Sequence, residues 1–167
     1  MGVTQEDLQE AFAGESQANR TYLAFAQKAE EDGYGQVARL FRAAAASETV
    51  HALNHLQVMG GIDDTLDNLK EAAEGEAAEF KEMYPEFIER AREGGNEEAR
   101  DSFEYASKVE EIHHSLYEKA IEAVQQGQDL PETEMFVCQG CGNTVEGEAP
   151  ESCPICGAPK SMFEKIE

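Results

Sequence analysis

Glutamate and histidine recur at one spacing in two places of the chain, as Glu48-x-x-His51 and Glu110-x-x-His113. In a helix, residues three positions apart lie on one face, so a carboxylate and an imidazole in this pattern can bind the same metal ion. Two such pairs, with one further Glu from each of two other helices, form the carboxylate-bridged dinuclear sites of some four-helix bundles. Oxygen ligands combined with imidazole suit iron or manganese. The spacing therefore predicts a dinuclear metal centre.

Glu15 and Glu76 are the candidates for the two remaining ligands. Each interrupts an apolar helical stretch, and each precedes the Glu of one Glu-x-x-His motif by a nearly equal interval. Taken singly, either residue could be an ordinary solvated Glu in an acidic chain. Taken together, their symmetric positions favour metal ligands, because buried carboxylates repel one another unless cations lie among them.

Three further residues lie close to these candidates along the sequence. Glu79 follows Glu76 by one helical turn and has no counterpart in the first half of the chain. We interpret it as a fifth carboxylate that binds one metal in one redox state; the alternative is a surface Glu. Tyr22 and Tyr84 follow the two Glu candidates by one to two turns, either as core aromatic residues or as phenols that hydrogen-bond to a ligand.

All four cysteines lie near the end of the chain, as Cys138-x-x-Cys141 and Cys153-x-x-Cys156, each pair followed by Gly. Two such pairs form a tetrahedral four-sulfur metal site, and in a reducing compartment their clustering argues against disulfides. The spacing fits zinc, which would make the segment a structural cap, or iron, which would make it a one-electron carrier. Residues 128–134 form a polar linker, so residues 135–167 are a separate module, too small to fold without its metal.

Four predicted helices between residue 4 and about residue 127 position the carboxylates and histidines. Apolar residues recur there at helical spacing. The helical stretches end at glycines: Gly33 and Gly35, Gly60 and Gly61, Gly94 and Gly95, and Gly127. Thr4 and Asn96 are suitable N-caps, and Pro85 is expected to kink the third helix. The pattern predicts an all-α four-helix bundle over residues 1–130, and it leaves open whether a crossover joins the second and third helices.

An internal repeat relates the two halves of the helical region. Identical residues recur 62 positions apart, among them Tyr22 and Tyr84 as well as Glu48 and Glu110. Glu76 departs from this offset by one position. The region is therefore predicted to be two copies of one helix pair, related by an approximate twofold axis.

The composition excludes several classes of partner. Asp and Glu number 35 against 13 Lys and Arg, for a formal net charge of −22. Such a surface repels phosphate backbones and anionic lipids, so neither a nucleic acid nor a membrane is expected as a partner. The apolar stretches are too short to span a bilayer, and the first residues lack the basic start and apolar run of a signal peptide. We therefore expect a cytoplasmic protein.

Taken together, the motifs resemble those of the rubrerythrin family over essentially the whole chain. The resemblance rests on residues 11–18 (AFAGESQA), on Glu76-x-x-Glu79 followed by Met83-Tyr84-Pro85, on both Glu-x-x-His motifs and on the four cysteines. It implies a ferritin-like di-iron bundle over residues 1–130 and a rubredoxin-like module over residues 135–167. The implied cofactors are two non-haem irons with oxo and carboxylate bridges and one iron in an Fe(Cys)4 centre, which zinc can replace in recombinant protein.

The resemblance also assigns roles to single residues. Bridging carboxylates would be Glu48 and Glu110, and terminal ligands would be Glu15, Glu76 and His113. Glu79 and His51 would alternate on one iron as the centre is oxidised and reduced. The single iron would be bound by Cys138, Cys141, Cys153 and Cys156. Glu79 and His51 would therefore take part in catalysis, and to them we add Tyr22 and Tyr84, on the ground of their positions near Glu15 and Glu76 alone.

A peroxidase is the activity that this resemblance implies, with hydrogen peroxide reduced to water at the di-iron centre. The Fe(Cys)4 centre would return electrons one at a time, drawn ultimately from NAD(P)H through a separate reductase or rubredoxin. A homodimer or higher homo-oligomer is also implied, and in its head-to-tail form the rubredoxin iron of one subunit serves the di-iron site of the other. Two other classes stay open: a ferroxidase or iron-handling protein, and a structural protein with zinc in both places.

Overall fold

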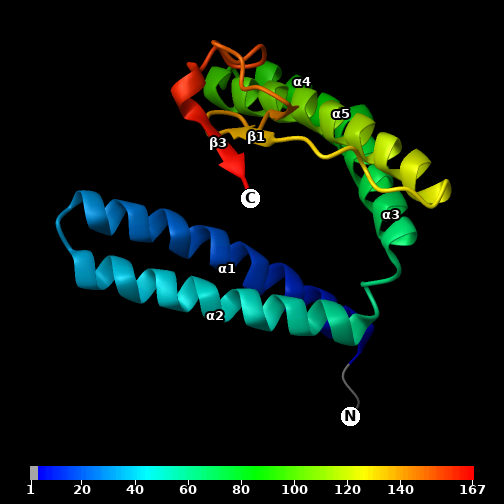
Figure 1. Cartoon of the computed structure of the whole chain (residues 1–167). Coiled ribbons are helices and arrows are strands. Elements are labelled where there is room, and N and C mark those ends of the chain that lie inside the picture. The colour runs from blue at the N-terminus through cyan, green and yellow to red at the C-terminus, as the bar shows by residue number, and fades with distance from the viewer. Residues whose placement is uncertain (1–3) are drawn as a thin grey trace. The chain divides into compact units, whose positions relative to one another are not determined.

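The structure, a computed structural model, describes residues 4–167 (Figure 1). The residues before Thr4, on which part of the signal-peptide prediction depends, lie outside the described residues. The helices are α1 (Gln5–Glu31), α2 (Gly35–Met59), α3 (Thr65–Ala78), α4 (Tyr84–Glu93) and α5 (Glu97–Gln125), with a π-helical segment η1 (Glu79–Met83) between α3 and α4. None of the helices described in this range is both long and apolar enough to cross a membrane.

Three short strands follow the helices: β1 (Met135–Cys138), β2 (Thr144–Glu146) and β3 (Phe163–Ile166). A 3-10 helix, Lys160–Met162, precedes the last strand. The prediction of a helical region followed by a small cysteine-bearing module is thus confirmed. The chain divides into two compact units, which we call the N-terminal unit (up to Asp63) and the C-terminal unit (Asp64–Glu167).

The N-terminal unit is an antiparallel pair of helices, α1 and α2 (Figure 1). The predicted N-cap is present: Thr4 Oγ1 accepts from the Asp7 N–H at 3.1 Å, and the Thr4 N–H donates to the Asp7 carboxylate at 2.9 Å. Alanines are the residues that this unit buries: Ala26, Ala29, Ala38, Ala45 and Ala52. Small side chains let the two helices approach closely, and Asn19 Nδ2 donates to the Ala45 carbonyl at 2.7 Å. This contact fixes the register of α1 against α2.

The C-terminal unit pairs the run α3–η1–α4 with α5. The helix α5 begins as predicted, with Asn96 Oδ1 accepting from the Ala99 N–H at 3.0 Å. Buried apolar side chains lie along the pair: Ala73, Ala91, Val109, Ala120 and Ile121. His114 joins α5 to α3, because its Nδ1 hydrogen-bonds to the Ala73 carbonyl at 2.9 Å and its ring lies 5.6 Å from that of Phe80.

The π-helical segment accounts for the one-position departure of Glu76 from the repeat. In η1 the Tyr84 N–H bonds to the Glu79 carbonyl, five residues back instead of four, so this turn accommodates one extra residue. Pro85 lies in the first turn of α4, directly after this segment. Beyond η1 the two halves match again: the Tyr22–Phe41 ring centroids are 6.2 Å apart and those of Tyr84–Phe103 are 6.3 Å apart.

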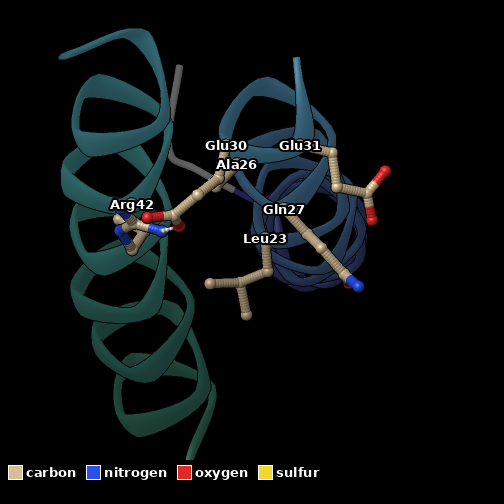
Figure 2. Close-up of a pocket in the computed structure, with 6 residues that line it drawn as sticks. All are labelled: Leu23, Ala26, Gln27, Glu30, Glu31 and Arg42. Atoms are coloured by element: carbon tan, nitrogen blue, oxygen red, sulfur yellow. Dashed lines mark hydrogen bonds and ion pairs between the residues drawn. The ribbon is translucent and has the colours of Figure 1, made fainter. Parts of the chain in front are cut away.

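One ion pair recurs in both units with its charges exchanged. Arg42 Nη1 lies 2.7 Å from Glu30 Oε2 in the N-terminal unit, where Figure 2 shows the pair linking α2 to α1. In the C-terminal unit Arg92 Nη2 lies 2.8 Å from Glu104 Oε1, at the equivalent positions. Exposed pairs of this kind contribute at most about 1 kcal/mol. Their recurrence supports the predicted duplication.

The small module is a three-stranded antiparallel sheet in the order β2-β1-β3. Its buried residues are few: Cys138, Asn143, Ala149 and Cys153. The module lies against α5, where Lys119 Nζ pairs with Glu146 Oε2 at 2.7 Å. Because two of the four buried residues are cysteines, the interior of the module is organised around sulfur.

Candidate metal centres

The four cysteine sulfurs converge within the small module. Cys138 Sγ lies 3.7 Å from Cys156 Sγ, and Cys141 Sγ lies 3.6 Å from Cys153 Sγ. All four are free thiols. A tetrahedron with zinc–sulfur bonds of about 2.3 Å has edges of about 3.8 Å. The sulfur positions therefore fit a four-sulfur metal site.

Backbone geometry around the thiols favours the thiolate form that a metal requires. Gly142 and Gly157, which follow the two Cys pairs, have φ values of 83° and 77°, a conformation that glycine adopts without strain. Burial works to raise the pKa of the Cys153 thiol, but hydrogen bonds from the Cys156 and Ile155 N–H groups outweigh it and lower the pKa to about 7. Burial raises the pKa of the Cys141 thiol. Metal uptake must therefore release protons.

In the N-terminal unit the structure brings together Glu15 from α1 with Glu48 and His51 from α2. One donor atom from each residue lies within 4.8 Å of the others. His51 Nδ1 lies 2.8 Å from Glu48 Oε2 and 3.7 Å from Glu15 Oε1. We call these three residues the first acidic cluster.

In the C-terminal unit the structure brings together Glu76 from α3 with Glu110 and His113 from α5, also within 4.8 Å. His113 Nδ1 lies 2.8 Å from Glu110 Oε2 and 3.6 Å from Glu76 Oε1. This second acidic cluster reproduces the first to about 0.1 Å in both distances. In each cluster Nδ1 is the imidazole atom that faces the carboxylates, and two carboxylates with one imidazole form a donor set suited to iron.

Glu79 and the two tyrosines lie outside these two sets of converging donors. Glu79 is the first residue of η1, and burial, followed by the charge of Glu76, raises the pKa of its carboxyl. Burial, followed by the charges of Glu79 and Glu110, raises the pKa of the Tyr84 phenol. Tyr84 therefore lies close enough to the second acidic cluster for the charge of the cluster to raise the pKa of its phenol. Tyr22 is half-buried and lies against Phe41.

Sequence reasoning missed Thr144. Its Oγ1 lies 2.9 Å from Nε2 of His113, so a residue of the small module contacts the second acidic cluster. A cavity of about 290 Å³ adjoins this contact, lined by side chains that include Leu69, Tyr117 and Met135. No local motif marks Thr144, because the contact depends on how the module packs on α5.

A larger hollow of about 520 Å³ lies on the N-terminal unit, around the Glu30–Arg42 pair of Figure 2. Its other lining residues are Leu23, Ala26, Gln27 and Glu31. These residues are not among the converging donors, and the acidic side chains that line the hollow are exposed to solvent. We assign no function to it.

Metal-free protein is expected to become less stable as the pH rises. Burial, followed by the charge of Glu110, raises the pKa of the Glu76 carboxyl. A carboxyl whose pKa is higher in the folded protein than in the unfolded chain stabilises the fold below the unfolded value, about 4.3, and this contribution is lost as the pH rises through the folded value. The Tm of chelator-treated protein should therefore fall as the pH rises above the unfolded value of about 4.3.

Glu76→Gln should flatten this dependence, whereas Glu74→Gln, at an exposed position of the same helix, should leave it unchanged. Calorimetry at fixed ionic strength measures the effect. A Tm that rises with pH in the metal-free wild type would contradict the expectation.

Two family models match this chain. The one described as rubrerythrin covers residues 6–121, and the one described as the rubredoxin-like domain of rubrerythrin covers residues 136–164. Rubrerythrin-2 of Clostridium acetobutylicum is 36% identical over 176 residues, which cover 97% of this chain and 96% of that protein. Nigerythrin of Nitratidesulfovibrio vulgaris is 36% identical over 178 residues, which cover 98% of this chain and 86% of that protein.

Solved structures show the same similarity. A structure of nigerythrin in a mixed-valence state has a TM-score of 0.57 and 35% identity, and the match covers 99% of this chain and 88% of that chain. The chain therefore carries the donor groups of a carboxylate–histidine di-iron site and of a four-cysteine, rubredoxin-like iron site.

Proposed function

Because this chain belongs to the rubrerythrin family, we propose that it is a peroxidase that reduces hydrogen peroxide to water at a di-iron centre. The observation that carries the proposal is the presence, in one chain, of two matched acidic clusters and a four-sulfur site. Two irons held by the clusters would supply a pair of electrons at one place, and an iron held by the four cysteines would supply the single electrons that restore them.

We further propose that the two acidic clusters together supply the ligands of one dinuclear centre. Glu48 and Glu110 would be the bridging carboxylates, and Glu15, Glu76 and His113 the terminal ligands. The proposal rests on the matched donor sets and on the family. Anaerobic iron analysis and electron paramagnetic resonance test it, because two irons that share a bridge give a coupled mixed-valence signal. Two uncoupled ferrous sites would contradict it.

Glu79 and Tyr84 are proposed to handle protons at this centre. Burial and the charge of Glu76 raise the pKa of the Glu79 carboxyl, and burial and nearby carboxylate charges raise the pKa of the Tyr84 phenol. Glu79 would also exchange with His51 as an iron ligand. Tyr22 is the corresponding phenol candidate of the N-terminal unit, supported by its equivalent contact with Phe41.

Glu79→Ala is expected to retain both irons of the bundle while peroxide turnover slows on the order of 10- to 100-fold, the range seen when a group that tunes a metal site is removed. The measurement is iron content together with steady-state peroxide reduction. Glu82→Ala, an exposed position in the same π-helical segment, is the matched control. Unchanged turnover in Glu79→Ala would remove the redox role of this residue.

Stopped-flow mixing of anaerobic, fully reduced protein with hydrogen peroxide tests the activity. A peroxidase oxidises rapidly, gives water as the product and forms no iron mineral. Slow reaction with peroxide, fast reaction with O2 and mineral formation would favour the alternative, a ferroxidase or iron-handling protein. Native protein without the red colour of an iron–thiolate site would indicate zinc at the cysteines and a structural role.

NAD(P)H is proposed as the ultimate electron source, through a separate reductase or rubredoxin, and the cytoplasm as the location, since four free thiols suit a reducing compartment. A homodimer or higher homo-oligomer is also proposed. Membership of the rubrerythrin family supports this proposal. Sedimentation analysis tests the oligomeric state.

A further inference from the structure

In each unit a side chain of one helix donates a hydrogen bond to a backbone carbonyl of the other helix, close to the acidic cluster. Asn19 Nδ2 of α1 donates to the Ala45 carbonyl of α2 at 2.7 Å. His114 Nδ1 of α5 lies 2.9 Å from the Ala73 carbonyl of α3. Because a carbonyl oxygen can only accept, the proton of this bond is on Nδ1 of His114. We call these two hydrogen bonds the interhelical clamps.

The clamp of the N-terminal unit brackets Glu48 of the first acidic cluster. Its donor, Asn19, lies one turn after Glu15 on α1, and its acceptor, Ala45, lies one turn before Glu48 on α2. Because a side-chain amide carries two hydrogens, Asn19 Nδ2 also donates to Thr49 Oγ1, at 2.8 Å. The amide of Asn19 therefore binds α2 on both sides of Glu48.

The clamp of the C-terminal unit brackets Glu76 of the second acidic cluster in the same way. Its donor, His114, lies one turn after Glu110 on α5, and its acceptor, Ala73, lies one turn before Glu76 on α3. The ring of His114 also lies 5.6 Å from that of Phe80, one turn after Glu76. The imidazole of His114 therefore contacts the run α3–η1 on both sides of Glu76.

The internal repeat did not produce one clamp from the other. The repeat relates α2 to α5, yet the donor comes from α1 in the N-terminal unit and from α5 in the C-terminal unit. Ala52, which lies 62 positions before His114, has no donor in its side chain. The two halves thus reach the same arrangement around their carboxylates with different residues, which points to a shared requirement of the two clusters.

This requirement is the alignment of two helices, on which each cluster depends for one of its three donors. The geometry of α2 alone places Glu48 beside His51, but Glu15 comes from α1, with its Oε1 3.7 Å from His51 Nδ1. A slip of one residue between the helices would move Glu15 by about 1.5 Å, whereas metal–ligand distances hold to within about 0.2 Å. Repulsion between the carboxylates favours such a displacement until a metal is bound. Glu76 depends in the same way on the alignment of α3 with α5.

Burial of the acceptors strengthens both clamps. Ala45 and Ala73 are 1% and 2% exposed, so water does not compete for their carbonyls. The short side chain of alanine also lets the neighbouring helix approach until Asn19 or His114 reaches the backbone. Each clamp therefore fixes the position of one helix along the other, beside the carboxylates.

We propose that Asn19 and His114 are positioning residues, which hold the carboxylates of the two acidic clusters in a metal-binding arrangement before any metal is present. This inference rests on the proposed function and deepens it, because the carboxylates that the clamps align are the ligands of the proposed centre. Partners that orient metal ligands typically change metal affinity by about 10- to 100-fold when they are removed.

Manganese(II) binding, followed by electron paramagnetic resonance of the free ion, tests the proposal without any turnover. The metal-free protein first receives one equivalent of zinc, which the softer thiolates bind, so that manganese titrates the acidic clusters. Asn19→Leu and His114→Phe keep the approximate size of each side chain but lack the donor. Each should raise the dissociation constant for manganese on the order of 10- to 100-fold.

Exchange of the two donor types should restore binding. The donor nitrogen is bonded to Cγ in asparagine and in histidine alike, so His114→Asn and Asn19→His can each donate to the same carbonyl. Both variants should bind manganese nearly as tightly as wild type. Binding as weak in His114→Asn as in His114→Phe, or as weak in Asn19→His as in Asn19→Leu, would overturn the proposal.

Two matched controls remove hydrogen bonds of the same kind that do not align a cluster. Gln5→Ala removes a bond to the Met59 carbonyl, which joins α1 to α2 far from Glu15, and Ser115→Ala removes a bond to the Glu111 carbonyl within α5. Both should bind manganese as wild type does. Binding weakened as much in the controls as in Asn19→Leu and His114→Phe would contradict a specific role of the clamps.

The titration also separates positioning from general stability. Circular dichroism well below the Tm establishes that each metal-free variant is folded, and the two units provide two separate tests. A clamp that only stabilised the fold would lower the Tm and leave the dissociation constant unchanged, and that result would overturn the proposal. A wild type that binds manganese but does not reduce peroxide would refute the proposed activity alone, since the titration involves no turnover.

Discussion

Cys141→Ser is expected to abolish donor-driven peroxide reduction, by at least about 100-fold, while leaving a single oxidation of the di-iron centre by peroxide intact. The small module buries little besides its cysteines and Asn143, so its fold depends on the bound metal. Structural metal sites of this kind contribute on the order of 10 kcal/mol or more to folding. Loss of one thiolate therefore unfolds the module and removes the source of single electrons.

Two measurements distinguish this outcome from general unfolding. The red iron–thiolate absorption should disappear, whereas helical circular dichroism should be retained. Gln139→Ala changes an exposed residue between the same two cysteines and should keep both absorption and turnover. A Cys141→Ser protein that still turned over with NAD(P)H and its reductase would contradict the assignment of the four-sulfur site as the electron entry.

Glu110→Ala is expected to reduce the iron content of the acidic clusters from two ions to at most one, and to lower peroxide reduction on the order of 1,000-fold or more. Glu110 lies 2.8 Å from His113 Nδ1 and is proposed as a bridging ligand. Metal ions contribute several kcal/mol to such reactions, and about 4 kcal/mol corresponds to about 1,000-fold.

The same substitution should stabilise the metal-free protein at neutral pH. Part of the raised pKa of Glu76 comes from repulsion by Glu110, and removal of Glu110 relieves it. Glu111→Ala, at the next and exposed position of α5, should alter neither iron content nor stability. Full iron content and full activity in Glu110→Ala would show that the second acidic cluster is not a metal site.

Local sequence patterns predicted the elements that local chemistry determines. The capping of α1 by Thr4 and of α5 by Asn96 depends on a few neighbouring residues and agrees with the structure. The i, i+3 spacing likewise suffices to place a Glu and a His on one helix face, because helix geometry alone relates them. The two Cys-x-x-Cys pairs likewise predict a four-sulfur site from local spacing, without information from the rest of the fold.

Features that depend on packing could not be predicted in this way. The π-helical segment left a trace in the sequence, the one-position departure of Glu76 from the repeat, but that trace did not reveal which backbone conformation absorbs the extra residue. Thr144 gave no signal at all. The sequence also suggested a division into residues 1–130 and 135–167, which remains a prediction, whereas tertiary contacts group the small module with α3 to α5 in one compact unit.

The wide turn at η1 has a consequence for how the two halves of the chain diverged. A duplicated ancestor would begin with equal copies, and an insertion within an ordinary helical turn would rotate everything after it by about 100°. A π turn accommodates the inserted residue locally, so the aromatic contacts that follow it are kept. Glu79 is then present in the second half of the helical region without a counterpart in the first. Insertion of one residue can thus make the two halves of a duplicated fold chemically different, without a new domain and without a change in the helix packing that follows.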